Sequence, residues 1–125
     1  MKMLLAVFIG GGSGSLARYW LAGWIGRMAA GPFPWPVFVI NVLGSMLMGV
    51  IVELAAVRLS LSPEMRALPT VGVLGGFTTF SSFSLDAALL LQRGEMALAF
   101  AYMAGSVIVS VAALFAGLWL VRVLV

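Results

Sequence analysis

Neutral hydrogen-bonding side chains recur at helical spacing within otherwise apolar stretches of this chain. Tyr102, Ser106 and Ser110 follow one another every four residues, and Asn41 lies inside another apolar stretch. Residues four apart share one face of an α-helix, so the three hydroxyls form a line about 12 Å long. Amide and hydroxyl groups donate hydrogen bonds without a fixed charge. The pattern therefore predicts a path for a small anion, which must bind to donors and leave them again.

Segment 75–84 places two glycines and five hydroxyl side chains inside an apolar stretch. Glycine, serine and threonine allow a broken membrane helix to re-satisfy its freed backbone groups. A break here exposes carbonyl oxygens, which can form a cation site. Phe80 and Phe83 share one face of this segment, beside Thr79 and Ser82, and the edge of an aromatic ring is its positive part. Two phenylalanines at this spacing also fit ordinary packing, so the interleaved hydroxyls carry the functional interpretation.

Other motifs have both a structural and a functional interpretation. Gly10 and Gly14 form a small-xxx-small pair, which favours close helix contact over phosphate binding because no Gly-Lys-Ser/Thr motif follows. Ser45 and Gly49 likewise favour close helix packing. Arg18 either extends its guanidinium to the membrane interface or lines an aqueous vestibule that attracts anions.

The composition excludes several classes of protein. Of the 125 residues, 63% are hydrophobic and only 9% are charged, against about 25% charged in soluble domains. Cysteine and histidine are absent, which removes thiol nucleophiles, imidazole bases and Cys/His metal sites. The net charge of +3 is spread over single residues, so nucleic-acid binding is not expected. We expect an integral membrane protein that is not an enzyme.

Charged residues divide the chain into four apolar stretches, which predict an all-α membrane domain over residues 1–125. A spanning helix needs about 20 mostly apolar residues. With a break in the third, the predicted transmembrane helices are 3–26, 34–57, 67–92 and 96–122. Residues 1–17 also resemble a cleaved signal peptide. Cleavage would discard the glycine-rich segment, so we favour four spans joined by very short loops.

The positive charges give only a weak preference for one orientation in the membrane. Four spans place both termini and the 58–66 loop on one side, which then carries Lys2, Arg58, Arg66 and Arg122. The other side carries Arg27 and Arg93, and Arg18 as well if it lies near that end of its helix, so the count is four against two or three. The positive-inside rule needs an imbalance to fix orientation. Two interpretations stay open: a single topology with cytoplasmic termini, or insertion in both orientations and pairing as an antiparallel homodimer.

Three segments and two hydroxyl residues together resemble one known family. The segments are GSLARY (14–19), NVLGS (41–45) and GGFTTFSSF (75–83), and Tyr102 and Ser106 follow in order. Over essentially its whole length the chain resembles the small dual-topology fluoride channels. The resemblance implies antiparallel homodimers with two pores at the subunit interface. It also implies passive fluoride export across the cytoplasmic (inner) membrane, which reduces fluoride toxicity.

The resemblance also implies roles for individual residues. The fluoride pore would be lined by amide, aromatic and hydroxyl side chains, namely Asn41, Phe80, Phe83, Thr79, Ser82, Tyr102, Ser106 and Ser110. Arg18 and Asp86 are candidates for the vestibule. A structural sodium ion would be held by the backbone carbonyls of Gly75 and Thr78 from both subunits, and no organic cofactor is expected. Pro36 and Val37 stand where the family commonly has Gly-Thr, which removes one vestibule hydroxyl.

Two other functions compete with a fluoride channel. A proton-coupled multidrug exporter of similar size needs a membrane-embedded carboxylate, typically in the first span, and no Asp or Glu lies in 3–26. A purely structural assembly subunit would not need rows of hydrogen-bond donors. Glu53 and Asp86 lie near the ends of their spans, where they can reach a vestibule but not the centre of a path. The residues therefore favour a small-anion channel.

Overall fold

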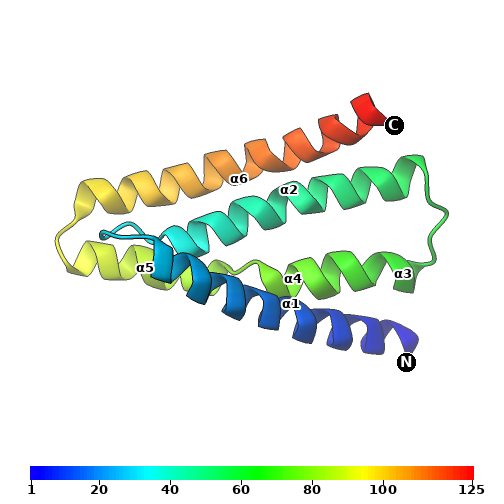
Figure 1. Ribbon diagram of the computed structural model, residues 1–125, viewed down its shortest axis with the longest axis horizontal. Helices are drawn as coiled ribbons and strands as arrows, with labels where there is room; N and C mark the ends of the chain where they lie inside the picture. The colour runs from blue at the N-terminus through cyan, green and yellow to red at the C-terminus, as the bar shows by residue number, and fades with distance from the viewer.

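The computed structural model describes residues 1–125 and is entirely helical, with four rods that run up and down side by side (Figure 1). The first, second and fourth rods are single helices: α1 (Lys2–Met28), α2 (Trp35–Val57) and α6 (Met96–Leu124). The third rod is built from four pieces: α3 (Pro63–Ala67), the π-helical segment η1 (Leu68–Leu74), α4 (Gly75–Phe77) and α5 (Phe80–Gln92). The predicted all-α architecture with an interrupted third helix is confirmed.

Three of the rods are long and apolar enough to cross a membrane: Trp35–Val57, Pro63–Gln92 and Met96–Leu124. The α1 helix has 27 residues, a length of about 40 Å, but its glycines and Arg18 lower its hydropathy. The structure thus supports a multi-pass membrane protein with three such spans, and the fourth span over 3–26 stays a prediction.

The third rod begins earlier than predicted. Its first helical residue is Pro63, not residue 67, and the Ser62 hydroxyl accepts a hydrogen bond from the amide of Met65 at 3.2 Å. Proline is favoured in the first turn of a helix, where its missing N–H is not needed, and serine is a strong N-cap. The helix thus extends through charged residues before the apolar run begins, and the span over 67–92 stays a prediction.

The rods pack in two pairs whose contacts depend on glycine. The α2 helix lies along α6, and α1 lies along η1 and α4 (Figure 1). A Cβ atom built on Gly49 would collide with the carbonyl oxygen of Leu114, and one on Gly14 with the carbonyl of Val73. At Gly10, a Cβ would lie 2.6 Å from the Leu68 carbonyl oxygen. The backbones therefore touch at these points, which confirms the packing role predicted for Gly10, Gly14 and Gly49.

Both termini and the 58–62 loop lie at one end of the bundle (Figure 1). At that end the guanidinium of Arg122 donates to the Glu53 carboxylate, with Nε to Oε1 at 2.7 Å. The Glu53 side chain is only 11% exposed, and a nearly buried carboxylate needs such a partner. A second arginine, Arg58, donates to the carbonyl oxygen of Val125 at 2.9 Å. These contacts fasten the end of α6 to α2.

Candidate functional site

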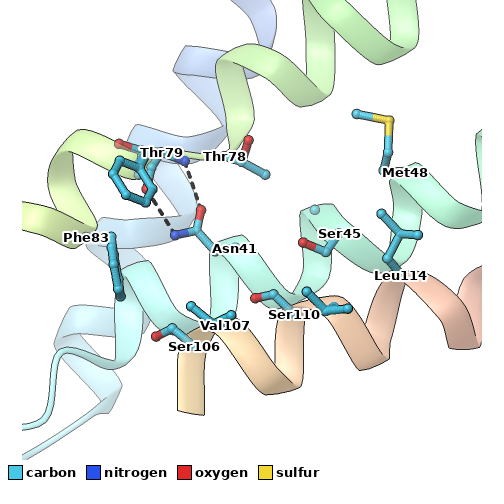
Figure 2. Close-up of a pocket in the computed structure, with 13 residues that line it drawn as sticks. Asn41, Ser45, Met48, Thr78, Thr79, Phe83, Ser106, Val107, Ser110 and Leu114 are labelled. Carbon is cyan, nitrogen blue, oxygen red and sulfur yellow. Dashed lines mark hydrogen bonds between the residues drawn. The ribbon is translucent and has the colours of Figure 1, made fainter. Parts of the chain in front are cut away.

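The break in the third rod lies at Thr78 and Thr79, and Asn41 of α2 holds it open. Both threonines have extended backbone angles, so the helix cannot continue through them. The Thr79 amide donates to Oδ1 of Asn41 at 2.8 Å, and Nδ2 of Asn41 donates to the Thr79 carbonyl at 3.0 Å (Figure 2). The asparagine thus bonds to both backbone polar groups of Thr79, whose amide has lost its helical acceptor.

The carbonyl oxygens of residues 75–78 lose their ordinary helical donors at this break, because the amides of residues 79–82 make no backbone hydrogen bond to them. In a continuous helix the Thr79 amide would bond to the carbonyl of Gly75, but it bonds to Asn41. The Ser82 amide would bond to the carbonyl of Thr78, but it donates to the Thr79 hydroxyl at 3.1 Å, which caps α5. Gly75 and Thr78, the two residues predicted to hold sodium, are therefore the first and the last of four residues whose carbonyls lose these donors.

A groove of about 420 Å³ begins beside the break and runs between α2 and α6 (Figure 2). Three parts of the chain line it, namely α2, the break with the start of α5, and α6. The lining residues are Asn41, Gly44, Ser45, Met48, Thr78, Thr79, Phe80, Phe83, Ser106, Val107, Ser110, Val111 and Leu114. No charged side chain is among them, so the wall offers amides, hydroxyls, ring atoms and aliphatic groups.

The groove brings together six of the eight side chains predicted to line a pore: Asn41, Thr79, Phe80, Phe83, Ser106 and Ser110. The rings of Phe80 and Phe83 lie together, with centroids 5.5 Å apart and planes tilted by 43°. Phe80 is 78% exposed in the single chain, whereas Phe83 is half-buried. One ring thus stands at the open side of the groove and the other forms its wall.

The serine hydroxyls of α6 have no hydrogen-bond partner in the chain. The Oγ atoms of Ser106 and Ser110 are both buried and unpaired, and both residues line the groove one turn apart (Figure 2). A buried polar group without a partner costs about 1–3 kcal/mol. These two hydroxyls are therefore free to donate to a molecule or ion that occupies the groove.

The remaining predicted side chains lie outside the lining. Tyr102 is fully buried behind Phe83, with ring centroids 5.2 Å apart, and its hydroxyl donates to Oδ2 of Asp86 at 3.1 Å. The side chain of Ser82 does not line the groove, although its amide is part of the cap on α5. Arg18 on α1 is half-buried and makes no ion pair within the chain.

Sequence reasoning missed part of the wall. Val107, Val111 and Leu114 continue the row of Ser106 and Ser110 along α6. Their spacing of three and four residues was a usable signal, because it places them on the same face of the helix. Ser45 was interpreted as a packing residue, but it also lines the groove, as do Gly44 and Met48.

Known proteins similar to this chain cover nearly its whole length. Residues 5–118 match the family described as CrcB-like protein, Camphor Resistance (CrcB). A protein named fluoride-specific ion channel FluC from Rhodospirillum centenum is 52% identical over 122 residues, which are 98% of this chain and 97% of the relative. FluC proteins of Nitrobacter winogradskyi and Agrobacterium fabrum are 51% and 52% identical over 97% and 98% of this chain, covering 96% and 98% of their own lengths.

These matches confirm the resemblance seen in the sequence motifs. They span nearly the full length of this chain and of each relative, and the family is one of ion channels. With no Cys or His and only four acidic residues, the chain also has no cluster of three or more such side chains that could hold a metal ion. This chain belongs to the CrcB-like protein family, which is a family of ion channels and not of enzymes.

Proposed function

We propose that this protein is a fluoride-selective channel and that the groove between α2 and α6 is one wall of its pore. Relatives about 50% identical over nearly the whole chain carry the name fluoride-specific ion channel. The single observation that carries the proposal is the pair of buried, unpaired hydroxyls of Ser106 and Ser110 beside the Phe83 ring. An ion that accepts hydrogen bonds would remove the cost of leaving them unpaired.

The chemistry of the wall favours a small anion. A cation pathway is commonly lined by carboxylates or carbonyl oxygens, and no Asp or Glu lines the groove. The amide of Asn41 and the two serine hydroxyls provide donors, while the edges of Phe80 and Phe83 provide weak positive potential. No lysine or arginine is present to hold the ion too long. Several weak donors in a row suit an ion that exchanges its hydration shell for protein groups and then leaves.

A second copy of the chain in inverted orientation would complete the pore. Phe80, Val107 and Val111 line the groove yet are 78%, 57% and 52% exposed, so the single chain leaves one side of the groove open. Positive charge differs little between the two ends of the bundle, which permits insertion in both orientations. An antiparallel homodimer has two equivalent grooves, and we therefore propose two pores at the dimer interface.

A structural sodium ion fits the break in the third rod. The carbonyl oxygens of Gly75 and Thr78 have lost their helical donors, and hard cations prefer oxygen ligands of this kind. Gly75 is exposed in the single chain, so a second copy could add its own two carbonyls. Such an ion, when bound, would supply positive charge that holds two carbonyl-rich breaks together. The residues of this chain supply the acceptors and, through Asn41, keep the helix open.

Passive conduction would export fluoride from the cell across the cytoplasmic membrane. An inside-negative membrane potential contributes about 2.3 kcal/mol per charge for every 100 mV, and it drives an anion outward. No carboxylate lies within α1 or in the groove wall, so the proton exchange of a multidrug exporter has no obvious carrier. Export without energy input would lower cytoplasmic fluoride and reduce its toxicity.

The test is an efflux assay with the purified protein in liposomes loaded with fluoride. A fluoride-selective electrode records the ion outside, and a potassium ionophore clamps the membrane potential. We expect rapid fluoride loss that is unchanged when a protonophore collapses any proton gradient. Loss no faster than from protein-free liposomes would contradict the proposal. Loss that requires a proton gradient would favour the coupled exporter instead.

A further inference from the structure

A chain of aromatic rings connects the loop between α1 and α2 to the groove. Phe33 of that loop lies edge-on to Tyr102, with ring centroids 5.5 Å apart and planes at 87°. Tyr102 in turn contacts Phe83 at 5.2 Å, and Phe83 lines the groove. Three rings thus link a loop at one end of the bundle to the wall of the proposed pore.

Phe33 is held firmly at its end of this chain. It lies between Pro32 and Pro34, whose rings fix φ and limit the conformations of the loop. Its ring also packs on Trp35, with centroids 4.5 Å apart, and on Phe38 at 5.4 Å, where the planes meet at 73°. The loop residue therefore has a defined orientation, which it can impose on its neighbour.

Tyr102 connects Phe33 to Phe83 because its buried ring contacts both of them. Its side chain is 0% exposed, and its hydroxyl is tied to Asp86 at 3.1 Å. A hydroxyl bond fixes one end of a tyrosine but leaves the ring able to tilt. Phe33 and Phe83 both pack on that ring, so the tilt of Tyr102 and that of Phe83 depend on whether Phe33 is present.

We propose that Phe33 is a positioning residue for ion conduction: through Tyr102 it holds the Phe83 ring at the angle that presents its edge to the groove. The inference rests on the proposed function, because it concerns the ring that would meet fluoride. Ring orientation matters since the edge of an aromatic ring attracts an anion and its face repels one. Phe33 itself does not line the groove and touches no ion.

Single-channel recording from the purified protein in planar bilayers tests this role, because it separates the current through one pore from the number of working pores. We expect Phe33→Ala to lower the unit fluoride conductance about two- to tenfold, the factor that loss of one aromatic pair produces in a rate. The fluoride-to-chloride permeability ratio should fall as well. Phe33→Trp keeps an aromatic ring, so its unit conductance and its permeability ratio should stay close to those of the wild-type protein.

Phe100→Ala is the matched control. It removes the same ring two residues from Tyr102, on the same helix, but Phe100 is 60% exposed and has no aromatic partner. Its unit conductance should not change. In a Tyr102→Leu background, Phe33→Ala should have no further effect, because the ring through which Phe33 acts is gone.

The outcomes distinguish this inference from the proposed function. If the wild-type protein passes no fluoride current, both the proposed channel function and the positioning role of Phe33 are overturned. A conducting protein in which Phe33→Ala lowers only the number of active channels, with unit conductance and selectivity intact, would overturn the positioning role alone. If Phe33→Ala does not assemble, Phe33→Leu is recorded in its place, since leucine fills much of the space without a ring, and the same criterion applies.

Discussion

Asn41 lies 38 residues from Thr79 in the sequence, yet its side-chain amide bonds to both the backbone N–H and the carbonyl of Thr79 at the break. An asparagine amide carries two donor hydrogens, and only one of them is used within the chain. The other is left for an occupant of the groove, which Asn41 lines. A single residue therefore connects the backbone geometry of the third rod to the proposed ion path.

Asn41→Asp should abolish fluoride efflux from liposomes. The carboxylate can still accept from the Thr79 amide, but it cannot donate to the Thr79 carbonyl, and it adds a negative charge to the groove. Repulsion between two unit charges about 4 Å apart is on the order of 4 kcal/mol at the effective dielectric near a protein surface. We therefore expect a loss of more than about 100-fold. Gln92→Glu, the same chemical change at an exposed site near the end of α5, should leave efflux intact.

Retained efflux in Asn41→Asp would mean that Asn41 serves only the helix break. Circular dichroism and size-exclusion chromatography of the variant would show whether the fold and the assembly persist, so that a loss of flux is assigned to the path.

Phe80→Ile and Phe83→Ile should each lower fluoride efflux at least about tenfold, because isoleucine fills space without the positive ring edge. Both variants should elute in size-exclusion chromatography like the unchanged protein. Phe8→Ile is the control for Phe80→Ile. Phe8 is 78% exposed, as Phe80 is, but it lies on α1 and does not line the groove. Normal efflux in both groove variants would remove the aromatic role.

Sequence spacing predicted the donors of the groove well but not the depth of each side chain. Ser106 and Ser110 line the wall as expected because their neighbourhood is local, set by successive turns of one helix. Tyr102 shares their face, yet it lies behind Phe83. Phe33, from a loop 69 residues earlier in the chain, packs against its ring. No local pattern contains that contact.

The third rod shows at the scale of elements what a sequence can and cannot predict. Its glycines and hydroxyls predicted an interruption, which the structure has at Thr78 and Thr79. The π-helical segment Leu68–Leu74 was not expected. It accommodates Gly72, whose Cα lies so close to α1 that a Cβ on Gly10 would be 2.8 Å from it. The segment also contains Pro69, which has no N–H to donate to the preceding turn.

Gly14→Ala and Gly12→Ala should have opposite effects on stability. A Cβ at Gly14 would collide with the Val73 carbonyl, whereas a Cβ at Gly12 meets nothing within 4 Å. Overpacking costs about 1–3 kcal/mol, while alanine gains up to about 1 kcal/mol over glycine in a helix interior. In detergent, the melting temperature should fall for Gly14→Ala and hold or rise for Gly12→Ala. Equal melting temperatures would show that α1 can shift away from the third rod without cost.

The whole chain has a donor-lined groove that is open along one side, and its charges barely distinguish its two ends. Phe80 lines the groove and yet is 78% exposed, because nothing in the single chain covers its ring. Both facts follow from the sequence only in part. The weak charge bias can be counted, but the open side emerges only when the rods are assembled. In the proposed antiparallel dimer, the second copy covers that side.

Single cysteines should report both orientations in cells. The natural chain has no cysteine, so Ser60→Cys, in the exposed loop at the end of the bundle that holds both termini, introduces a unique thiol. A membrane-impermeant maleimide should label about half of it in intact spheroplasts and the rest after permeabilisation, as expected for equal insertion both ways. Gln92→Cys, towards the opposite end, should give the same fraction. Labelling of one variant only from outside and the other only from inside would establish a single topology.

The direct backbone contact between α2 and α6 has a consequence for how this protein tolerates its surroundings. Where Gly49 meets Leu114, and Gly117 meets Met46, no side chain stands between the helices. This contact between α2 and α6 therefore contains no side chain that could change rotamer with temperature or bilayer thickness. A change in bilayer thickness should first affect the residues that face outward. The spacing between α2 and α6 should therefore change little between membranes of different composition.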